Sequence, residues 1–473
     1  ALPISTMYKE KISRYIDEHK EEMLEDIAKL CRIDSAKDSY RAGRPFGDGC
    51  FEALQTALAM AEGYGFSIDN YDSYVGTVDM NDKEKQLDIL AHLDIVPAGD
   101  GWTVTKPFEP VVKDGKIYGR GTADDKGPAI AALYAMRAVK ELGIPLNRNV
   151  RLILGTDEEC GSSDIKHYYS VEKEAPMTFS PDGAFPVINI EKGGLHGRFT
   201  AEFEKCEKLP RLVSFHSGTK SNVVPANAEA LIEGLDGSET EEFAHTFEKE
   251  LGVRFDVTSE DGYLKLEAFG EGAHASTPWK GKNALTGLLT LLGKLPLADC
   301  GQVRRIHALN RMMPHGEWNG ESLGIAMEDE LSGHLTLAFT MLEITETSLS
   351  GDFDSRCPIC SNVENTLQPV KKLMKKHEIS LNNDSMRPPH HVSADSEFVK
   401  TLLKDYEMYT GRKGECIAIG GGTYVHELER GVAFGASMPE TENNMHGPDE
   451  YAVVDELLTS AKIFAQVIVD LCR

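Results

Sequence analysis

The stretch from Leu87 to Pro97 constrains the fold of this chain more than any other. Its apolar residues lead to His92 and Asp94, and Pro97 then ends the run. A short run of Leu and Ile between turn residues predicts a strand covered on both faces, as in a mostly parallel sheet. Sites in such sheets lie beyond the carboxyl ends of the strands. His92 and Asp94 are expected on one side of that strand, although a single His-x-Asp is also typical of a structural histidine.

Acidic residues follow two further predicted strands. The strand at 149–155 is followed by Asp157-Glu158-Glu159, and the strand at 177–180 leads into Pro181-Asp182-Gly183. Carboxylates so close together repel one another unless a proton or a cation lies between them. A solvated acidic turn would explain the charge at one strand end, but it does not explain why acidic residues recur at several.

Two glycine-bearing segments add further candidates for a metal site. Gly119-Arg120-Gly121 precedes Asp124 and Asp125 at the start of a predicted helix, and His446 lies in a loop near the end of the chain. Capping of that helix by Asp125 is an alternative, and spacing alone does not choose between the two aspartates. Imidazole with carboxylate favours zinc, manganese or cobalt over copper(I) or an iron–sulfur cluster. One carboxylate bridging two ions about 3.5–4 Å apart would let five ligands bind two metals and leave a sixth residue as base. The candidates are His92, Asp124, Glu158, Glu159, Asp182 and His446.

Length and composition narrow the class of protein. A chain of 473 residues is too long for one hydrophobic core, so two or three domains are expected. Its 50 basic and 76 acidic residues give a formal charge of -26, which disfavours nucleic acid and anionic membranes as partners. No apolar run is long enough to predict a membrane span. Nine scattered cysteines suit a reducing cytoplasm, and the pair Cys357 and Cys360 is only a weak zinc or redox signal.

The order of predicted elements indicates a discontinuous domain with an insertion. Helices and strands alternate from residue 7 to about 190, starting with an amphipathic helix over 8–31, and this pattern returns near the end of the chain. We therefore predict an α/β, doubly wound, mostly parallel-sheet catalytic domain over 7–190 and 385–473. Residues 191–384 are predicted as an inserted α+β lid domain with two β-rich, ferredoxin-like halves that divide near 311–320.

Six motifs taken together resemble the M20 metallopeptidase family. Their order, their spacing and the long insertion are most similar to its PepV-like dipeptidase branch. The motifs are His92-Leu93-Asp94-Ile95-Val96-Pro97, Gly119-Arg120-Gly121 with Asp124-Asp125-Lys126-Gly127, Glu158-Glu159, Ser180-Pro181-Asp182, Gly272-Ala273-His274-Ala275-Ser276, and Glu442 to Gly447. The resemblance covers the chain from Met7 onward.

The resemblance implies a role for each residue of a dinuclear site. It places His92 and Asp182 on one metal, Glu159 and His446 on the other, and Asp124 as the bridge. Asp124 rather than Asp125 holds the family's place three residues after Gly-Arg-Gly. Asp94 would orient His92, and Glu158 would be the general base that takes a proton from the attacking water and passes it to the leaving amine. Two Zn²⁺ ions are expected, with Mn²⁺ or Co²⁺ left open.

The same resemblance implies substrate-binding residues in the insertion and after it. His274 would donate a hydrogen bond to the tetrahedral oxyanion, and Asn222 would lie near the substrate. Arg356 would clamp the C-terminal carboxylate of the substrate, which suits the bidentate geometry of guanidinium. Backbone amides of Gly421, Gly422 and Thr423 would bind the same carboxylate. The chain departs from the family at Cys357, where relatives often have tyrosine.

The expected activity is metal-dependent hydrolysis of the amide bond in dipeptides and short peptides. The long insertion resembles the doubled lid of the PepV-like branch, which implies a cytoplasmic monomer. Two alternatives stay open: an N-acyl-amino-acid deacylase, such as a desuccinylase, of the same superfamily, and a non-catalytic binding protein on the same scaffold. Neither nucleic acid nor a membrane is expected as a partner.

Overall fold

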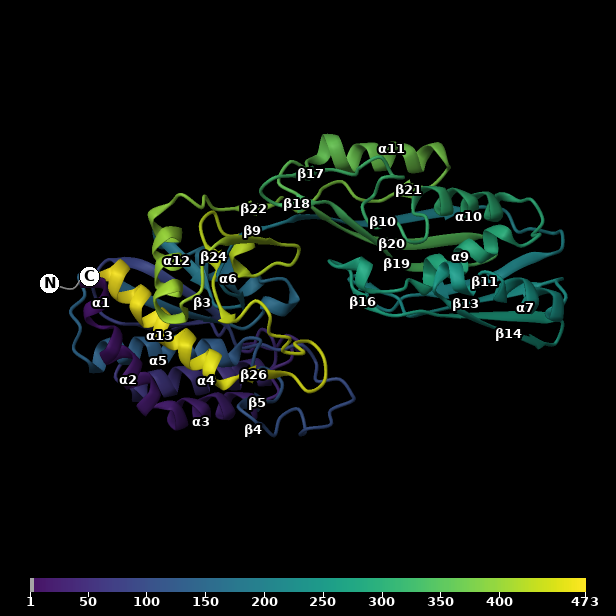
Figure 1. Ribbon diagram of the computed structural model, residues 1–473. Coiled ribbons are helices and arrows are strands. Elements are labelled where there is room, and N and C mark those ends of the chain that lie inside the picture. Colours follow the sequence, from purple (N-terminus) through teal and green to yellow (C-terminus); the bar gives the residue numbers. More distant parts are fainter. Residues whose placement is uncertain (1–3) are drawn as a thin grey trace. The chain divides into compact units, whose positions relative to one another are not determined.

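The computed structural model describes residues 4–473, which form two compact units (Figure 1). The first unit comprises the chain up to Ile190 together with His390–Ile417 and Gly422–Arg473. The second unit comprises Glu191–Pro389 and Ala418–Gly421. The predicted roles of these parts, catalytic domain and lid, remain predictions.

Hydrogen bonds within the second unit explain why its boundaries differ from the predicted ones. Arg387 exchanges two backbone hydrogen bonds of 3.0 and 2.9 Å with Gly194, so the chain up to Pro389 stays with the second unit. The segment Ala418–Gly421 joins the same unit because Arg356 donates a 2.7 Å hydrogen bond to the carbonyl oxygen of Gly420.

The single helix predicted over 8–31 is two helices. His19 separates α2 from α3, because its ring stacks on Tyr15 at 3.9 Å and its Nδ1 lies 2.6 Å from the Tyr15 carbonyl oxygen. The helices in this part are α1 (Ile4–Met7), α2 (Lys9–Glu18), α3 (Lys20–Cys31) and α4 (Asp48–Gly63).

A nine-stranded sheet forms the centre of the first unit. Its order is β1-β2-β6-β3-β7-β24-β9-β22, and β23 pairs with β9. The central strand β3 is parallel to β6 and β7, and β24 is parallel to β7, whereas β1, β2 and β9 pair in antiparallel fashion. Its strands are β1 (Ser67–Tyr71), β2 (Val75–Asp79), β3 (Lys85–His92), β6 (Asn149–Gly155), β7 (Met177–Ser180), β9 (Val187–Glu191), β22 (His390–His391), β23 (Cys416–Ile419) and β24 (Val432–Ala433).

Helices bury the apolar strands of this sheet. The closing helix α13 (Val454–Cys472) packs against α5 (Lys126–Glu141) and α12 (Glu397–Thr410) (Figure 1). Most of its apolar residues are buried. The predicted α/β class is therefore confirmed. Smaller elements complete the unit: β4 (Val111–Lys113), β5 (Lys116–Tyr118), β8 (Gly183–Ala184), β25 (Ala436–Ser437), β26 (Tyr451–Val453), η1 (Glu158–Cys160), α6 (Ser163–Tyr169) and η4 (Tyr424–Glu427).

One continuous antiparallel sheet forms the second unit. Its order is β14-β15-β13-β11-β19-β20-β10-β21, so the two predicted halves share a sheet through the pairing of β11 with β19. Helix α9 (Ala284–Lys294) packs on β13, β15 and β19. The strands are β10 (Gly193–Glu202), β11 (Arg211–Ser217), β13 (Asn227–Glu233), β14 (Arg254–Glu260), β15 (Tyr263–Phe269), β19 (Thr336–Ile344), β20 (Ser348–Cys357) and β21 (Ser380–Leu381).

Helices and two small ribbons complete the second unit. Helices α7 and α8 are separated by Thr246 and Phe247. The elements are β12 (Val223–Val224), β16 (Ala273–His274), β17 (Glu328–Asp329), β18 (Gly333–His334), α7 (Gly237–His245), α8 (Glu248–Leu251), η2 (Pro278–Lys280), α9 (Ala284–Lys294), α10 (Gly301–Met312), η3 (Val363–Leu367) and α11 (Gln368–Lys376). Within residues 4–473, no helix has both the length and the apolar character needed to cross a bilayer.

A buried carboxyl group predicts a pH-dependent stability of the first unit. Asp405 on α12 is fully buried, and burial together with the neighbouring carboxyl group of Asp470 on α13 raises its pKa to about 10. The unfolded chain releases this proton near pH 4. The folded state therefore binds the extra proton, and stability falls as pH rises from about 4 toward about 10. Replacing Asp405 with Asn should stabilise the protein by about 1 kcal/mol at pH 8. Urea unfolding at pH 5 and pH 8 tests this, since an equal effect at both pH values would contradict it.

Candidate functional site

His92 lies at the carboxyl end of β3 and is fully buried. Its Nδ1 is 2.9 Å from the carbonyl oxygen of Asp94 and 3.3 Å from Oδ1 of the same residue. A ring nitrogen that donates to such oxygens leaves the opposite nitrogen with a free lone pair. Nε2 of His92 is therefore oriented as a metal ligand.

Three carboxylates surround that nitrogen. Nε2 of His92 lies 3.0 Å from Asp124 Oδ1, 3.4 Å from Asp182 Oδ2 and 3.6 Å from Glu158 Oε2. Ligands bound to one Zn²⁺ at 2.0–2.2 Å lie about 3.4 Å from each other in tetrahedral geometry. The spacing of these atoms fits a shared ion.

Asp124 lies between two imidazoles. Its Oδ1 faces His92, and its Oδ2 is 2.8 Å from Nε2 of His446, which also lies 3.3 Å from Oε1 of Glu159. Each carboxylate oxygen thus faces a different histidine, which is the arrangement required of a bridging ligand. Asp125 uses its Oδ2 to accept the backbone N–H of His92 at 3.2 Å and makes no helix-capping hydrogen bond. The geometry favours Asp124 as the bridge.

The acidic turn after β6 is held by Asp94. The carboxylate of Asp94 accepts the backbone N–H of Glu158 at 3.2 Å and that of Glu159 at 3.0 Å. Asp164 holds the preceding residues, because its Oδ2 accepts the N–H groups of Thr156 and Asp157. Asp94 therefore positions two acidic side chains in addition to the ring of His92.

Burial and mutual repulsion change the pKa values of the acidic groups in the cluster. Burial, together with Asp182, raises the pKa of Glu158 well above its usual value. Burial raises the pKa of Glu159 to about 8 and that of Asp182 to about 7, and the charge of Asp124 adds to both shifts. Burial alone would raise the pKa of Asp124, but hydrogen bonds with His446 and His92 hold it well below its usual value. A site of this kind must bind protons or cations.

The ligand atoms fall into three groups that could each hold a metal ion. Within each group the atoms lie within 4.8 Å of one another, and none of the groups found among residues 4–473 contains a cysteine. The groups are His92 with Asp125 and Asp182, His92 with Glu158 and Glu159, and Asp124 with Glu159 and His446. All five predicted ligands and the predicted base are present in this one cluster.

A buried ion pair that the sequence did not indicate orders the surrounding loops. Arg120 and Glu450 are each 1% exposed and meet at 2.8 Å. The second oxygen of Glu450 accepts backbone N–H groups at 3.0, 3.0 and 3.2 Å from Gly121, Ala123 and Asp124. Arg120 also donates to the carbonyl oxygens of Pro97, Ala98 and Gly447. The pair thereby connects the loops that carry Asp124 and His446.

Replacing Glu450 with Gln should weaken metal binding about 10- to 100-fold, because residues that orient metal ligands have effects of this size. The change removes the charge that pairs with Arg120 and weakens the acceptor that holds the Asp124 loop. Metal titration of the folded variant measures the affinity, and a thermal melt of the metal-free protein reports stability separately. Metal affinity equal to that of the parent chain would contradict this role.

The predicted oxyanion donor lies in the second unit. His274 is in β16, which pairs with β12 so that His274 is opposite Val223. The backbone N–H of Ser276 donates to Nδ1 of His274 at 3.1 Å, so the proton of the neutral ring is on Nε2. The carbonyl oxygen of Asn222 accepts the N–H of Ala275 at 2.9 Å. The ribbon of β12 and β16 therefore brings Asn222 and His274 together.

Arg356 lines a groove of the second unit that also contains Asn222. Its guanidinium donates to both oxygens of Asp354, at 2.6 and 3.0 Å, and to the carbonyl oxygen of Gly420. Three of its five donor hydrogens are thus used within the protein, and two remain for a ligand. Cys357 is buried next to it, and no disulfide forms among residues 4–473.

The predicted backbone donors divide between the two units. Gly421 belongs to the second unit, whereas Gly422 and Thr423 belong to the first. Thr423 is buried and directly precedes η4, and its side-chain oxygen accepts the N–H of Val425 at 3.3 Å. The part of these three residues in substrate binding remains a prediction.

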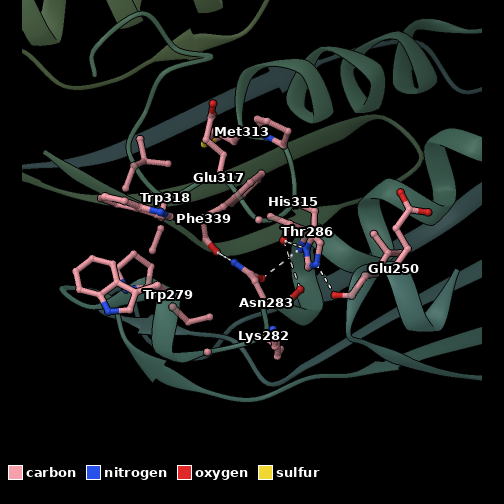
Figure 2. Close-up of a pocket in the computed structure, with 18 residues that line it drawn as sticks. Glu250, Trp279, Lys282, Asn283, Thr286, Met313, His315, Glu317, Trp318 and Phe339 are labelled. Atoms are coloured by element: carbon pink, nitrogen blue, oxygen red, sulfur yellow. Dashed lines mark hydrogen bonds between the residues drawn. The ribbon is translucent and has the colours of Figure 1, made fainter. Parts of the chain in front are cut away.

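A second cavity of the second unit lies beside the ribbon that carries His274 (Figure 2). It has a volume of about 330 Å³, and its wall includes Trp279, Trp318 and Phe339. His315 on its other side is hydrogen-bonded through both ring nitrogens, to Thr286 and to the carbonyl oxygen of Leu251, each at 2.7 Å. Because both nitrogens are satisfied within the wall, His315 is a structural residue. None of the predicted site residues lines this cavity.

Comparisons with known proteins agree with the resemblance seen in the motifs. Residues 89–470 match Peptidase family M20/M25/M40. The putative dipeptidase YtjP of Bacillus subtilis (strain 168) is 37% identical over 463 residues, covering 96% of this chain and 98% of that protein. The Beta-Ala-Xaa dipeptidase of Lactobacillus delbrueckii subsp. lactis is 33% identical, covering 96% and 97%. The crystal structure of human carnosine dipeptidase 1 shares the fold, with a TM-score of 0.61 at 16% identity over 98% of both chains.

The fold and the buried cluster of imidazoles and carboxylates define a metal-dependent hydrolase. The chain belongs to Peptidase family M20/M25/M40, which confirms the predicted family, and it is a metallopeptidase of the dipeptidase type.

Proposed function

We propose that this metallopeptidase cleaves the amide bond of dipeptides and short peptides with two divalent metal ions and a glutamate base. The observation that carries the proposal is the position of Asp124, with one oxygen facing His92 and the other facing His446. A single cation would need only one of these imidazoles. Two cations would use both and would neutralise the surrounding carboxylates.

The donor set fits the ions. His92 and Asp182 would hold one, Glu159 and His446 the other, and Asp124 both. Zn²⁺ is the preferred assignment for imidazole and carboxylate ligands, and Mn²⁺ or Co²⁺ would fit the same set. When bound, such ions polarise the substrate carbonyl and make water a nucleophile at neutral pH.

Glu158 moves the proton. Its carboxylate is nearly buried, its backbone is fixed by Asp94, and it is not needed as a ligand in this assignment. It takes the proton of the attacking water and delivers it to the amine that leaves. A pKa raised by burial suits a group that must both accept and release a proton near neutral pH.

Residues of the second unit would bind the rest of the substrate. His274 donates from Nε2 to the oxyanion, a contribution of about 2.7–4 kcal/mol for such donors. Arg356 uses its two remaining donors for the C-terminal carboxylate, and Asn222 lies in the same groove. We propose that the chain acts as a cytoplasmic monomer.

Chelation combined with a substrate panel tests this function. Treatment with EDTA should abolish hydrolysis of Ala-Leu, and added Zn²⁺, Mn²⁺ or Co²⁺ should restore it. An N-acyl-amino-acid deacylase would instead prefer N-succinyl or N-acetyl amino acids over dipeptides. A binding protein would hydrolyse neither class with any metal, which would contradict the proposal.

A further inference from the structure

We propose that Lys37 is a positioning residue for the reaction, because its ion pair with Asp157 holds the turn 157–160 that carries Glu158 and Glu159. This inference rests on the proposed function, in which Glu158 moves the proton and Glu159 binds a metal ion. Nζ of Lys37 lies 3.1 Å from Oδ1 of Asp157. Lys37 would therefore act through Asp157 and not on the reacting atoms.

Asp157 is a buried carboxylate at the start of this turn. Its side chain is 0% exposed, whereas the side chain of Lys37 is 40% exposed. Oδ2 of Asp157 accepts two hydrogen bonds from Ser163, at 3.1 Å from the backbone N–H and at 2.6 Å from the hydroxyl group. Oδ1 is also buried, and no hydrogen bond to it forms among residues 4–473. The ammonium group of Lys37 compensates this oxygen, which matters because a buried charge is costly unless it is paired.

The backbone of Asp157 shapes the turn that follows it. Its carbonyl oxygen accepts the N–H groups of Cys160 at 3.3 Å and of Ser162 at 2.8 Å. These hydrogen bonds close the chain around Glu158 and Glu159, which lie between Asp157 and Cys160 in the sequence. A displacement of Asp157 would therefore move the proposed base and a proposed metal ligand together.

The segment that carries Lys37 is fixed to the chain directly after β3. The hydroxyl group of Ser35 donates to the carbonyl oxygen of Leu93 at 2.7 Å, and the carbonyl oxygen of Ser35 accepts the N–H of Ile95 at 3.3 Å. Ala36 forms a parallel bridge with Ile95. Lys37 is the next residue, so its backbone is attached to the end of the central strand.

The ion pair is thus a second connection between the end of β3 and the turn after β6. Asp94 makes the first, because its carboxylate accepts two backbone N–H groups in the middle of the turn. Lys37 holds the start of the turn through Asp157, and its own ammonium group lies over the Phe46 ring, 5.3 Å from the ring centroid. Two points of attachment fix the direction of the turn as well as its distance from β3.

Replacing Lys37 with Met removes the cation and keeps the length of the side chain. Asp157 would then have one uncompensated buried oxygen, and the turn would shift to bring that oxygen to water. We expect kcat for Ala-Leu at saturating Zn²⁺ to fall about 10- to 100-fold, because small displacements of catalytic groups have effects of this size. KM should change little, since the proton transfer belongs to the chemical step. Lys37→Arg keeps the cation and should retain most of kcat.

A double-mutant cycle with Asp157→Asn tests whether the two residues act as a pair. Lys37→Met should lower kcat much less in the Asp157→Asn protein than in the parent chain, because the effects of interacting residues are not additive. Lys29→Met is the matched control, since Lys29 is 54% exposed and pairs at 3.7 Å with Asp26, which is 3% exposed. This change removes the same kind of ion pair from α3 of the same unit and should leave kcat unchanged.

Thermal melts of the same variants separate positioning from folding. A Lys37→Met protein that melts at a lower temperature but keeps the parent kcat would overturn the inference, because the ion pair would then only stabilise the fold. Additive effects of the two changes, or a Lys37→Arg enzyme as slow as Lys37→Met, would also overturn it. In each of these cases the parent chain still cleaves Ala-Leu, so the proposed function stands. A parent chain that cleaves no dipeptide with any of the three metals would remove the proposed function and the inference together.

Discussion

Replacing Glu158 with Gln is expected to lower kcat about 10²- to 10⁴-fold while the protein still binds its metal ions. Gln has the shape of Glu but cannot take a proton from water. The backbone of the turn should be unaffected, because Asp94 holds it through the N–H groups of residues 158 and 159. The loss should appear in kcat rather than in KM, since the proton transfer belongs to the chemical step.

Steady-state kinetics with Ala-Leu, combined with metal analysis of the purified variant, measures both quantities. Glu62→Gln provides the matched control, because it makes the same substitution at an exposed position of α4. Full activity of Glu158→Gln would show that another group moves the proton. Loss of metal together with activity would instead identify Glu158 as a ligand, which the group formed with His92 and Glu159 permits.

Much of the first unit could be predicted because local patterns carry its signals. The apolar run that ends at His92 is a central strand with neighbours parallel on both sides. The acidic residues after β6 and β7 lie close to His92 because the carboxyl ends of parallel strands lie at the same edge of the sheet. The same rule predicted the cluster without any knowledge of which strands are adjacent.

Other features depend on contacts between residues that are far apart in the chain. Glu450 holds the Asp124 loop from 326 positions away, and no spacing or composition signal marks it. Asp124 and Asp125 are adjacent in the chain, so their spacing did not show that the carboxylate of Asp124 faces His92 and His446 while that of Asp125 accepts the backbone N–H of His92. The interruption at His19 arises from a ring stacked on Tyr15, which a periodic apolar pattern does not reveal.

The second unit was harder to predict for a related reason. Its halves were expected as separate β-rich parts, yet β11 and β19 pair across more than a hundred intervening residues. Alternation of apolar and polar residues predicts a strand but not its partner. Residues that line the groove come from β10, β20 and the segment around Arg387, so their proximity became visible only once the strand register was known.

Replacing Asp124 with Asn is expected to abolish tight binding of both metal ions, with affinity lowered by more than about 100-fold. Asp124, the proposed bridge, has one oxygen facing His92 and the other facing His446. An amide offers one weak oxygen ligand and no charge, so neither ion would keep its bridging ligand. Activity should be lost in proportion to the metal.

Isothermal titration with Zn²⁺ measures the number of ions bound, and Asp125→Asn is the informative companion. Asp125 accepts the backbone N–H of His92, and an Asn oxygen can accept the same bond. This second variant should therefore keep two ions, with affinity reduced much less than in Asp124→Asn. The exposed loop variant Asp100→Asn controls for the loss of one acidic residue from a chain of net charge -26. If Asp125→Asn loses both ions and Asp124→Asn retains them, the bridge is assigned to the wrong aspartate, and the three carboxylates around His92 must be redistributed between the two ions.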